Sequence, residues 1–374
     1  MIEIDVEKRF GDFELAAQVS TAATGIVALF GRPRSGKTSL VNALAGLIRP
    51  DRGRIAIAGD MLFSSAEGID RPPERRRLGY VFREGRLFPH YSVRGNLAYG
   101  MRRPATRETA LGFDAVVELL SLAPLLRRRP HALSRGEAQR VAIGRALLAD
   151  PRLLMMDEPL ASLDVAQRAE LLPLIERLRD RLRIPILYVS REMAEITRLA
   201  DTLMVMSDGR IAAVGSLEDL AGRLDLRPFT DGLGAVIRAT VAGADLSYGL
   251  SELSFPGGRL RVPHLGLALG TPVRARIRAE DVTLALAPPK GLSILNGFAG
   301  RVLEVAEGQG AMVDVRLDIG QAGRPVALWA RVTRRSAHEL RLEAGKPVFA
   351  LVKSVALDRM SLSTPSPMSE AEGL

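Results

Sequence analysis

Residues 31–38, Gly31-Arg32-Pro33-Arg34-Ser35-Gly36-Lys37-Thr38, decide the fold of this chain. They follow the apolar run Ile26–Phe30 and lead into a segment of helical character, 39–44. A buried-type strand, a glycine-bounded loop and a Lys-Thr pair at a helix start form the arrangement that binds a nucleotide phosphate. Backbone N–H groups surround the phosphate, Lys37 reaches its outer oxygens, and Thr38 binds Mg²⁺. The alternative, a glycine turn with a surface lysine, does not explain why a hydrophobic strand runs straight into the loop.

The composition indicates a soluble globular chain with at least two domains. It has 374 residues, of which 47% are hydrophobic and 25% charged. No run approaches the roughly 18 apolar residues of a membrane span. The start, Met1–Asp5, shows no basic region followed by an apolar stretch, and we expect no secretory signal. The absence of cysteine excludes disulfides and thiolate metal sites and fits a cytoplasmic location.

The net charge of +9 raises the question of nucleic-acid binding. The arginines are spread along the chain, however, and aromatic residues make up only 5%, too few for an evident base-stacking surface. Clusters such as Arg75–Arg77 and Arg127–Arg129 are typical of solvated faces, and an anionic membrane surface or ligand is their alternative use. We therefore expect no nucleic-acid partner.

Strand and helix patterns alternate through residues 1–232, which predicts an α/β domain with a mainly parallel sheet and helices on both faces. Helical periodicity then nearly disappears, and β-type segments separated by Gly and Pro follow. They predict a second, all-β domain, a small barrel, with a connecting lobe at 233–289, a hinge at Pro288–Gly291 and the barrel proper at 290–358. The tail, 359–374, is rich in Ser, Pro and Glu and is predicted to be disordered.

Two further segments carry candidate chemistry. Asp157 and Glu158 close a hydrophobic strand, so Asp157 could hold Mg²⁺ through water and Glu158 could act as general base. An acidic pair in this place often only caps a helix, but a phosphate loop upstream and Pro159–Asp164 downstream favour function. In Leu133–Arg140, Ser and Gly at a helix start can present N–H groups to an anion, whereas the alternative is an ordinary serine cap with a capping box.

The order of these motifs resembles the ATP-binding cassette family. Residues 31–38 match its Walker A, the strand ending in Asp157-Glu158 its Walker B, Leu133–Arg140 its signature, and Ser162–Asp164 its D-loop. In that family ATP binds between the phosphate loop of one copy and the signature of another. The resemblance therefore implies a homodimer that uses ATP and Mg²⁺, in which ATP contacts residues 31–38 of one subunit. Its implied contacts from the second subunit are Ser134, Gly136 and Glu137.

The same resemblance places an adenine-stacking aromatic at Phe10, with Phe13 as the other candidate and a plain core residue as the alternative. It implies that Thr38 and Asp157 hold Mg²⁺ and that Glu158 is catalytic. The fold it implies is a P-loop NTPase with a helical subdomain, followed by the all-β, OB-like barrel.

Several stretches that are less specific than these motifs resemble the ATPase subunit of bacterial molybdate importers and its molybdate-binding barrel. This resemblance implies a peripheral protein on the cytoplasmic face of the inner membrane, coupling ATP hydrolysis to a membrane permease through the segment 84–105. A periplasmic binding protein would deliver molybdate or tungstate. Import of sulfate, iron or sugar is the alternative within transport. The stretches are Gly79–Phe82, Arg86–Tyr91, Val93–Leu97, Gly144–Leu148, Leu292–Asn296, Leu328–Arg331 and Val352–Leu357.

An oxyanion site needs N–H and O–H donors with one or two cations. Four residues of the predicted barrel supply such groups: Ser293, Asn296, Lys353 and Ser354. The alternative is a structural or regulatory barrel without a ligand.

Several residues depart from the family pattern, and most of them fall on catalytic positions. A non-glycine residue with positive φ in the phosphate loop costs about 1–2 kcal/mol, and a permanently protonated guanidinium cannot replace a neutral imidazole. We therefore predict ATP binding with slow or impaired hydrolysis; a nucleotide-binding regulatory protein is the alternative. The departures are Arg83 for the Q-loop glutamine, Arg191 for the switch histidine, Arg135 for the first signature glycine, Arg34 beside Pro33 for a phosphate-loop glycine, and Leu295 for a barrel arginine.

Overall fold

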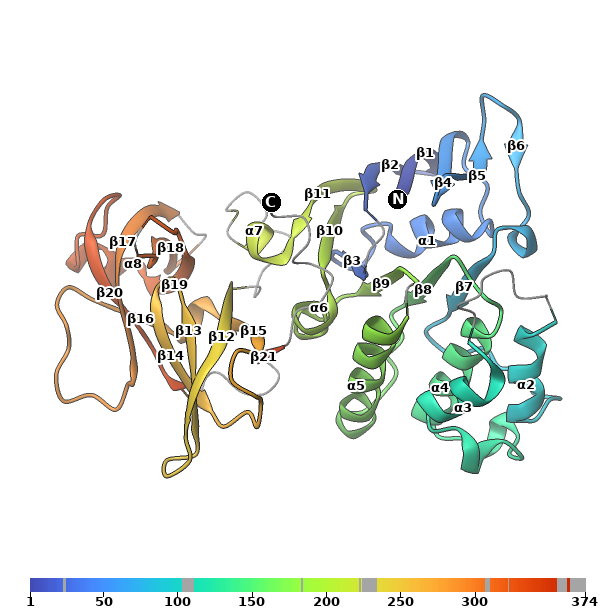
Figure 1. Cartoon of the computed structure of the whole chain (residues 1–374). Coiled ribbons are helices and arrows are strands. Elements are labelled where there is room, and N and C mark those ends of the chain that lie inside the picture. Colours follow the sequence, from blue (N-terminus) through green and yellow to red (C-terminus); the bar gives the residue numbers. More distant parts are fainter. Residues whose placement is uncertain are drawn as a thin grey trace. The chain divides into compact units, whose positions relative to one another are not determined.

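The structure is a computed structural model that describes residues 1–22, 25–102, 111–182, 184–221, 223, 234–306, 310–321, 323–354 and 362–363. The chain divides into two compact units, Met1–Gly215 and Ser216–Pro365 (Figure 1). We describe each unit by itself.

The first unit contains a five-stranded antiparallel sheet in the order β2-β1-β4-β5-β6. A tight turn at Gly11, which has φ 57°, joins its first two strands. Apolar residues alternate along β1 because one of its faces is buried. The strands are β1 (Ile2–Phe10), β2 (Phe13–Thr21), β4 (Arg52–Ile57), β5 (Asp60–Ser64) and β6 (Ile69–Asp70).

The second sheet of this unit is six-stranded, in the order β11-β10-β3-β9-β8-β7. The strands from β10 to β7 pair in parallel, which confirms the predicted α/β architecture. Its central strands are buried along their whole length, as both faces are covered. The strands are β3 (Ile26–Phe30), β7 (Leu78–Val81), β8 (Leu153–Asp157), β9 (Ile186–Ser190), β10 (Thr202–Ser207) and β11 (Arg210–Ser216).

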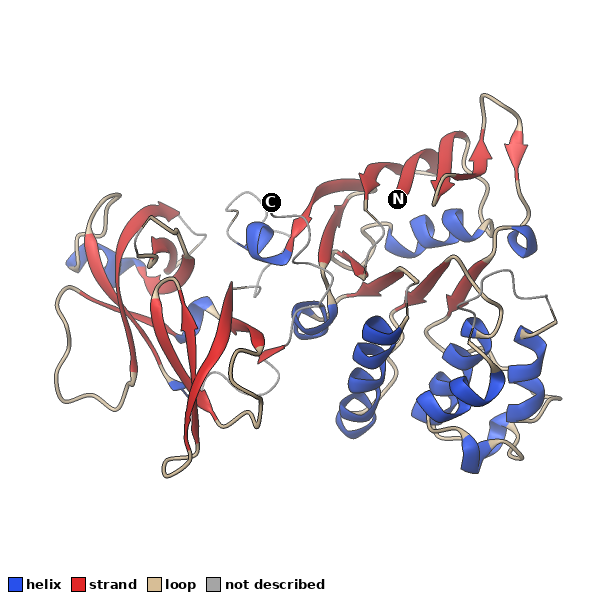
Figure 2. Ribbon diagram, in the orientation of Figure 1, coloured by secondary structure: helices blue, strands red, loops and turns tan. Residues whose placement is uncertain are grey.

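Helix α1 (Lys37–Ala45) lies between the two sheets, and its apolar side chains join a core that both sheets share. Helices α5 (Val165–Arg181) and α6 (Met193–Leu199) cover the other face of the parallel sheet (Figure 2). A separate helical group consists of α2 (Val93–Gly100), α3 (Phe113–Leu119) and α4 (Arg135–Leu147), with α4 in contact with both of the others. The carboxyl ends of β3, β7, β8 and β9 meet at one edge of the sheet, and this edge carries the candidate site.

The second unit is built from two antiparallel five-stranded sheets around one hydrophobic core. This all-β architecture is consistent with the predicted OB-like small barrel. One sheet has the order β14-β13-β12-β15-β21 and the other β16-β20-β17-β18-β19. The strands are β12 (Ala235–Asp245), β13 (Leu250–Phe255), β14 (Gly258–Pro263), β15 (Pro272–Ile277), β16 (Val282–Ala285), β17 (Asn296–Ala306), β18 (Met312–Asp318), β19 (Ala327–Thr333), β20 (Pro347–Val352) and β21 (Leu362–Ser363).

Three predictions about the ends and divisions of this unit need correction. β16 precedes the expected hinge at Pro288–Gly291 but pairs with β20, so the hinge does not separate two lobes with cores of their own. Leu362 and Ser363 of the predicted disordered tail form β21, because Arg274 and Ala275 at the edge of β15 offer them backbone groups to pair with. The rest of the tail lies outside the described residues.

The third correction concerns the start of the second unit. Helix α7 (Leu217–Ala221) groups with the β-sheets and not with the unit before it, although we placed the boundary after residue 232. Glu218 forms ion pairs with Arg238 and Arg274, and the Trp329 indole donates to the Ala221 carbonyl at 2.8 Å. These contacts join residues far apart in the sequence, and no local pattern predicts them. The short helix α8 (Arg334–Glu339) is the other described α-helix of this unit.

Candidate active site

A cavity of about 550 Å³ lies at the carboxyl edge of the parallel sheet. It brings the predicted phosphate loop together with the candidate base and with two of the arginines that depart from the family pattern. Gly31 and Arg32, at the start of the loop, and Asp157 are not among its lining residues. The lining consists of Phe13, Pro33, Arg34, Ser35, Gly36, Lys37, Thr38, Ser39, Arg83, Glu158 and Arg191.

The phosphate loop follows β3 directly and contains two residues with positive φ. Arg34 has φ 66° and Gly36 has φ 102°. A β-carbon at Gly36 would come within 3.0 Å of the Phe13 ring and 2.9 Å of Met206, so this position requires glycine. Arg34 adopts the positive φ expected of the glycine it replaces, at a cost of about 1–2 kcal/mol.

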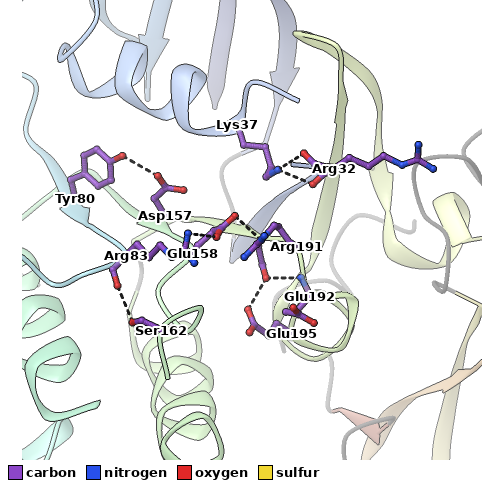
Figure 3. Close-up of polar contacts among 12 residues, drawn as sticks. Arg32, Lys37, Tyr80, Arg83, Asp157, Glu158, Ser162, Arg191, Glu192 and Glu195 are labelled. Atoms are coloured by element: carbon purple, nitrogen blue, oxygen red, sulfur yellow. Dashed lines mark hydrogen bonds and ion pairs between the residues drawn. The ribbon is translucent and has the colours of Figure 1, made fainter. Parts of the chain in front are cut away.

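Lys37 is the first residue of α1 and is only 5% exposed. Its Nζ donates to the carbonyls of Gly31 (2.7 Å) and Arg32 (2.8 Å) and to the Ser35 hydroxyl (3.4 Å) (Figure 3). Burial lowers the pKa of Lys37, an effect that the nearby Glu158 carboxylate opposes. The lysine therefore holds the loop from inside, with a charge that a phosphate can attract.

Asp157 ends β8 and is 8% exposed. Burial raises the pKa of its carboxyl group, while a hydrogen bond from Thr38 acts in the opposite direction. Tyr80 directs its hydroxyl at Asp157 Oδ2 (3.4 Å) and at Asn42 Oδ1 (3.0 Å). Asp157 Oδ1 is buried and has no hydrogen-bond partner among the described residues. A buried carboxylate oxygen without a partner beside a threonine hydroxyl fits Mg²⁺, which prefers oxygen ligands.

Glu158 lies between two arginines. Its Oε1 is 3.2 Å from Arg191 Nε and its Oε2 is 3.6 Å from Arg83 Nη1 (Figure 3). The glutamate side chain is 15% exposed, whereas those of Arg83 and Arg191 are 52% and 40% exposed. The backbone of Glu158 is left-handed, with φ 46°, a strained conformation that is concentrated at functional sites. Both oxygens that a general base would use are thus within ion-pair distance of guanidinium groups, although Oε2 accepts no hydrogen bond among the described residues.

A buried network that the sequence did not reveal joins the residues on both sides of Arg191. The Tyr188 and Ser190 hydroxyls donate to Glu195 Oε2 at 2.8 and 2.7 Å, and the Glu192 amide donates to the Ser190 hydroxyl at 3.0 Å. Burial raises the pKa of Glu195. The one signal in the sequence is a glutamate in the first turn of the helix after a buried strand, which alone indicates only a favourable helix dipole.

Replacing Glu195 with alanine should lower the free energy of unfolding of the first unit by about 1–3 kcal/mol, because two buried hydroxyls lose their acceptor. Urea denaturation measures this change. Glu339→Ala is the control: that glutamate is 60% exposed and pairs with Arg335 one helical turn away, so the loss should stay below about 0.5 kcal/mol. Equal losses for the two variants would contradict a structural role of the Glu195 network.

The signature segment forms the start of α4. Ser134 caps the helix in a capping box: the Glu137 amide donates to its hydroxyl at 3.2 Å, and the Ser134 amide donates to the Glu137 carboxylate at 2.7 Å. The serine cap with a capping box, which the sequence offered as the alternative to an anion site, is therefore present. Ser134, Gly136 and Glu137 do not line the cavity of their own chain. Their contact with ATP in a second subunit stays a prediction.

Of the two adenine-stacking candidates, Phe13 borders the cavity and Phe10 is not among its lining residues. Their ring centroids are 6.3 Å apart. Both rings come from the hairpin of β1 and β2, so the choice between them depends on strand register and not on a motif. We therefore prefer Phe13, although the stacking role of either ring stays a prediction.

Of the four tentative oxyanion residues, the structure brings Asn296 and Ser354 into contact. Asn296 is 1% exposed, and its amide is used to hold β14: it accepts from the Arg261 amide at 2.7 Å and donates to the Arg261 carbonyl at 3.0 Å. It also donates to the Ser354 hydroxyl at 3.2 Å. Ser293 and Lys353 are exposed, and neither forms a hydrogen bond with this pair among the described residues. The role of these residues stays a prediction.

The segment predicted to face a permease is described as far as residue 102. Arg145 of α4 donates to the Gly85 and Arg86 carbonyls at 3.2 and 2.8 Å, and its guanidinium lies 4.7 Å from the centre of the Phe88 ring. Tyr99 packs on Phe88 with centroids 4.6 Å apart and is 40% exposed. These contacts fix a surface of aromatic and arginine side chains on α2 and α4, next to the loop that carries Arg83.

A phosphate loop after β3, an acidic pair after β8 and a parallel sheet between helices define a P-loop nucleotide hydrolase, followed by an all-β unit. The family model described as "ABC transporter" matches residues 16–161, and the family model described as "TOBE domain" matches residues 292–358. Among the described residues, no helix is long and apolar enough to cross a membrane.

Curated relatives match over nearly the whole chain. The molybdenum import ATP-binding protein ModC of Rhodospirillum rubrum is 49% identical over 370 residues, covering 98% of this chain and 100% of the relative. The proteins of the same name from Paramagnetospirillum magneticum and Mesorhizobium japonicum are 50% and 46% identical, covering 96% and 100% of this chain and 98% and 100% of the relatives. The chain therefore belongs to the ATP-binding cassette family, as an ATPase subunit of the importer type.

Proposed function

We propose that this chain is the ATP-hydrolysing subunit of a bacterial importer for molybdate, with tungstate as a second substrate. The observation that carries the ATPase part is the cavity in which the phosphate loop faces Glu158. Support for the transported ion comes from full-length relatives whose names specify molybdenum import.

In the proposed reaction the amides of the loop and Lys37 bind the phosphates, and Phe13 stacks on adenine. Thr38 and Asp157 would hold Mg²⁺, which neutralises charge on the phosphates when it is bound. Glu158 would orient and deprotonate the attacking water. A second copy of the chain would complete the site with Ser134, Gly136 and Glu137.

The proposal that the chain is an importer ATPase also implies partners. Dimer closure would be transmitted by the aromatic and arginine surface of α2 and α4 to a permease in the inner membrane, with the chain at the cytoplasmic face. A periplasmic protein would deliver the oxyanion. A regulatory protein that binds ATP without turnover is the second candidate, and the two ion pairs on Glu158 favour it.

The complex of this chain with its permease and periplasmic binding protein, in liposomes, provides the test. We expect molybdate or tungstate to raise phosphate release at least about threefold, an effect within the usual range of coupling free energies, whereas sulfate leaves it unchanged. Stimulation by neither oxyanion would overturn the substrate. Tight ATP binding without phosphate release under any condition would favour the regulatory candidate.

A further inference from the structure

Three arginines at family-divergent positions belong to one chain of contacts. Arg135 Nη1 donates to the Ser162 carbonyl at 3.2 Å, and the Ser162 hydroxyl donates to the Arg83 carbonyl at 3.4 Å. The guanidinium of Arg83 then pairs with Glu158, whose other oxygen pairs with Arg191. Figure 3 shows the part of this chain from Ser162 to Arg191. The signature, the D-loop, the Q-loop position and the candidate base are therefore connected within a single subunit.

The contact of Arg135 depends on how two helices begin. Arg135 is the first residue of α4, and Ser162 lies in the turn between β8 and α5. The two helix starts are close enough for a β-carbon at Gly136 to meet the Gln167 side chain at 3.5 Å. The turn itself is tied to the base, because the Ala161 amide donates to the Glu158 carbonyl at 3.1 Å. A long side chain at position 135 can therefore reach the D-loop of its own subunit, which a glycine cannot do.

We propose that Arg135 is a positioning residue for Glu158 of its own subunit. It fixes Ser162, and Ser162 fixes the main chain from which Arg83 reaches the glutamate. The proposal rests on the proposed ATPase function. It gives the signature segment a role in its own subunit, whereas this segment is otherwise expected to act only on the nucleotide of the partner subunit. Removing the Arg135 side chain loosens Arg83 and releases Glu158 in part. These contacts are at the surface and individually weak, so the effect is modest.

Heterodimers with two affinity tags test the direction of this effect. Glu158→Gln in one subunit leaves a single hydrolysing site, and Arg135→Ala is then placed either in the subunit that keeps Glu158 or in its partner. We expect kcat to rise about two- to fivefold in the same-subunit arrangement, as expected for losing weak surface contacts. The ATP concentration at half-maximal rate should change less, and the partner arrangement should have the smaller effect. A larger change in the partner arrangement, or equal changes, would overturn the proposal.

A second measurement does not depend on turnover. Hydrogen–deuterium exchange of the peptide covering 158–164 should accelerate about two- to tenfold in Arg135→Ala, as expected for the loss of one surface hydrogen bond. Arg135→Lys, which keeps the charge and part of the reach, should restore part of the protection, and Arg127→Ala is the matched control for losing an exposed arginine. Unchanged exchange in Arg135→Ala would overturn the proposal. Absence of hydrolysis in every heterodimer would instead count against the proposed function, and the exchange experiment would still decide the role of Arg135.

Discussion

Replacing Arg83 with glutamine and Arg191 with histidine in the same chain is expected to raise the steady-state ATPase rate about ten- to hundredfold. The reason is that two ion pairs on a mostly buried carboxylate are together worth roughly 1.5–3 kcal/mol. In the structure the two guanidinium groups lie 3.6 and 3.2 Å from the two carboxylate oxygens of Glu158. Water can be deprotonated only by an oxygen that is free to approach it. Glutamine and histidine also restore a neutral amide and an imidazole at the positions where the family pattern expects them.

Phosphate release measured at saturating ATP checks this prediction. Adding Glu158→Gln to the double variant should abolish the gain, which shows that the gain passes through the glutamate. Arg259→Gln is the matched control, because Arg259 also pairs with a glutamate, Glu252 at 2.8 Å, but belongs to the all-β unit. A double variant with the rate of the unchanged chain would refute the idea that the arginines restrain hydrolysis.

Lys37→Ala is expected to weaken ATP binding about a hundredfold, since charge-assisted hydrogen bonds contribute roughly 1.5–3 kcal/mol each. Lys37 is only 5% exposed and its Nζ already lies inside the loop, so little further ordering is needed when Nζ turns from the carbonyls of Gly31 and Arg32 to a phosphate. The alanine also leaves those carbonyls without their donor, which loosens the loop. Calorimetric titration with a slowly hydrolysed ATP analogue measures the affinity.

Lys346→Ala is a control of the same chemistry. Its ammonium group donates to the Leu340 and Arg341 carbonyls at 2.6 and 3.1 Å, but it lies in the all-β unit. We expect the Lys346→Ala variant to bind the analogue with the same affinity as the unchanged chain. If Lys37→Ala bound ATP within threefold of the unchanged chain, the cavity would not be the nucleotide site.

We expect the divergent arginines to favour nucleotide binding over fast turnover. Arg34 adopts the backbone conformation that its loop position needs, so the phosphate loop keeps its shape. Arg83 and Arg191, by contrast, contact the base directly. Release of Glu158 would then become a step that a permease or a transported ion can control, and an ATPase with a low resting rate is suited to such control.

The sequence by itself determined the class of protein and its principal chemistry. The phosphate loop is contiguous, and its function depends on backbone N–H groups, one lysine and one threonine at fixed spacing. Buried strands that alternate with helices likewise carry their periodicity locally, which is why the parallel sheet and the place of Asp157 and Glu158 at its edge could be predicted.

Only the tertiary structure decided which residues meet across the fold. Phe13 rather than Phe10 at the cavity depends on strand register, and the contacts of Arg135 with Ser162 and of Glu195 with Tyr188 depend on how separate helices and strands are placed. The pairing of β16 with β20 and of β21 with β15 joins residues tens of positions apart. Local propensity contains no information about such encounters, because they are set by the packing of the whole core. The sequence alone predicts that Glu158 acts as a base, and the structure shows which arginines pair with it.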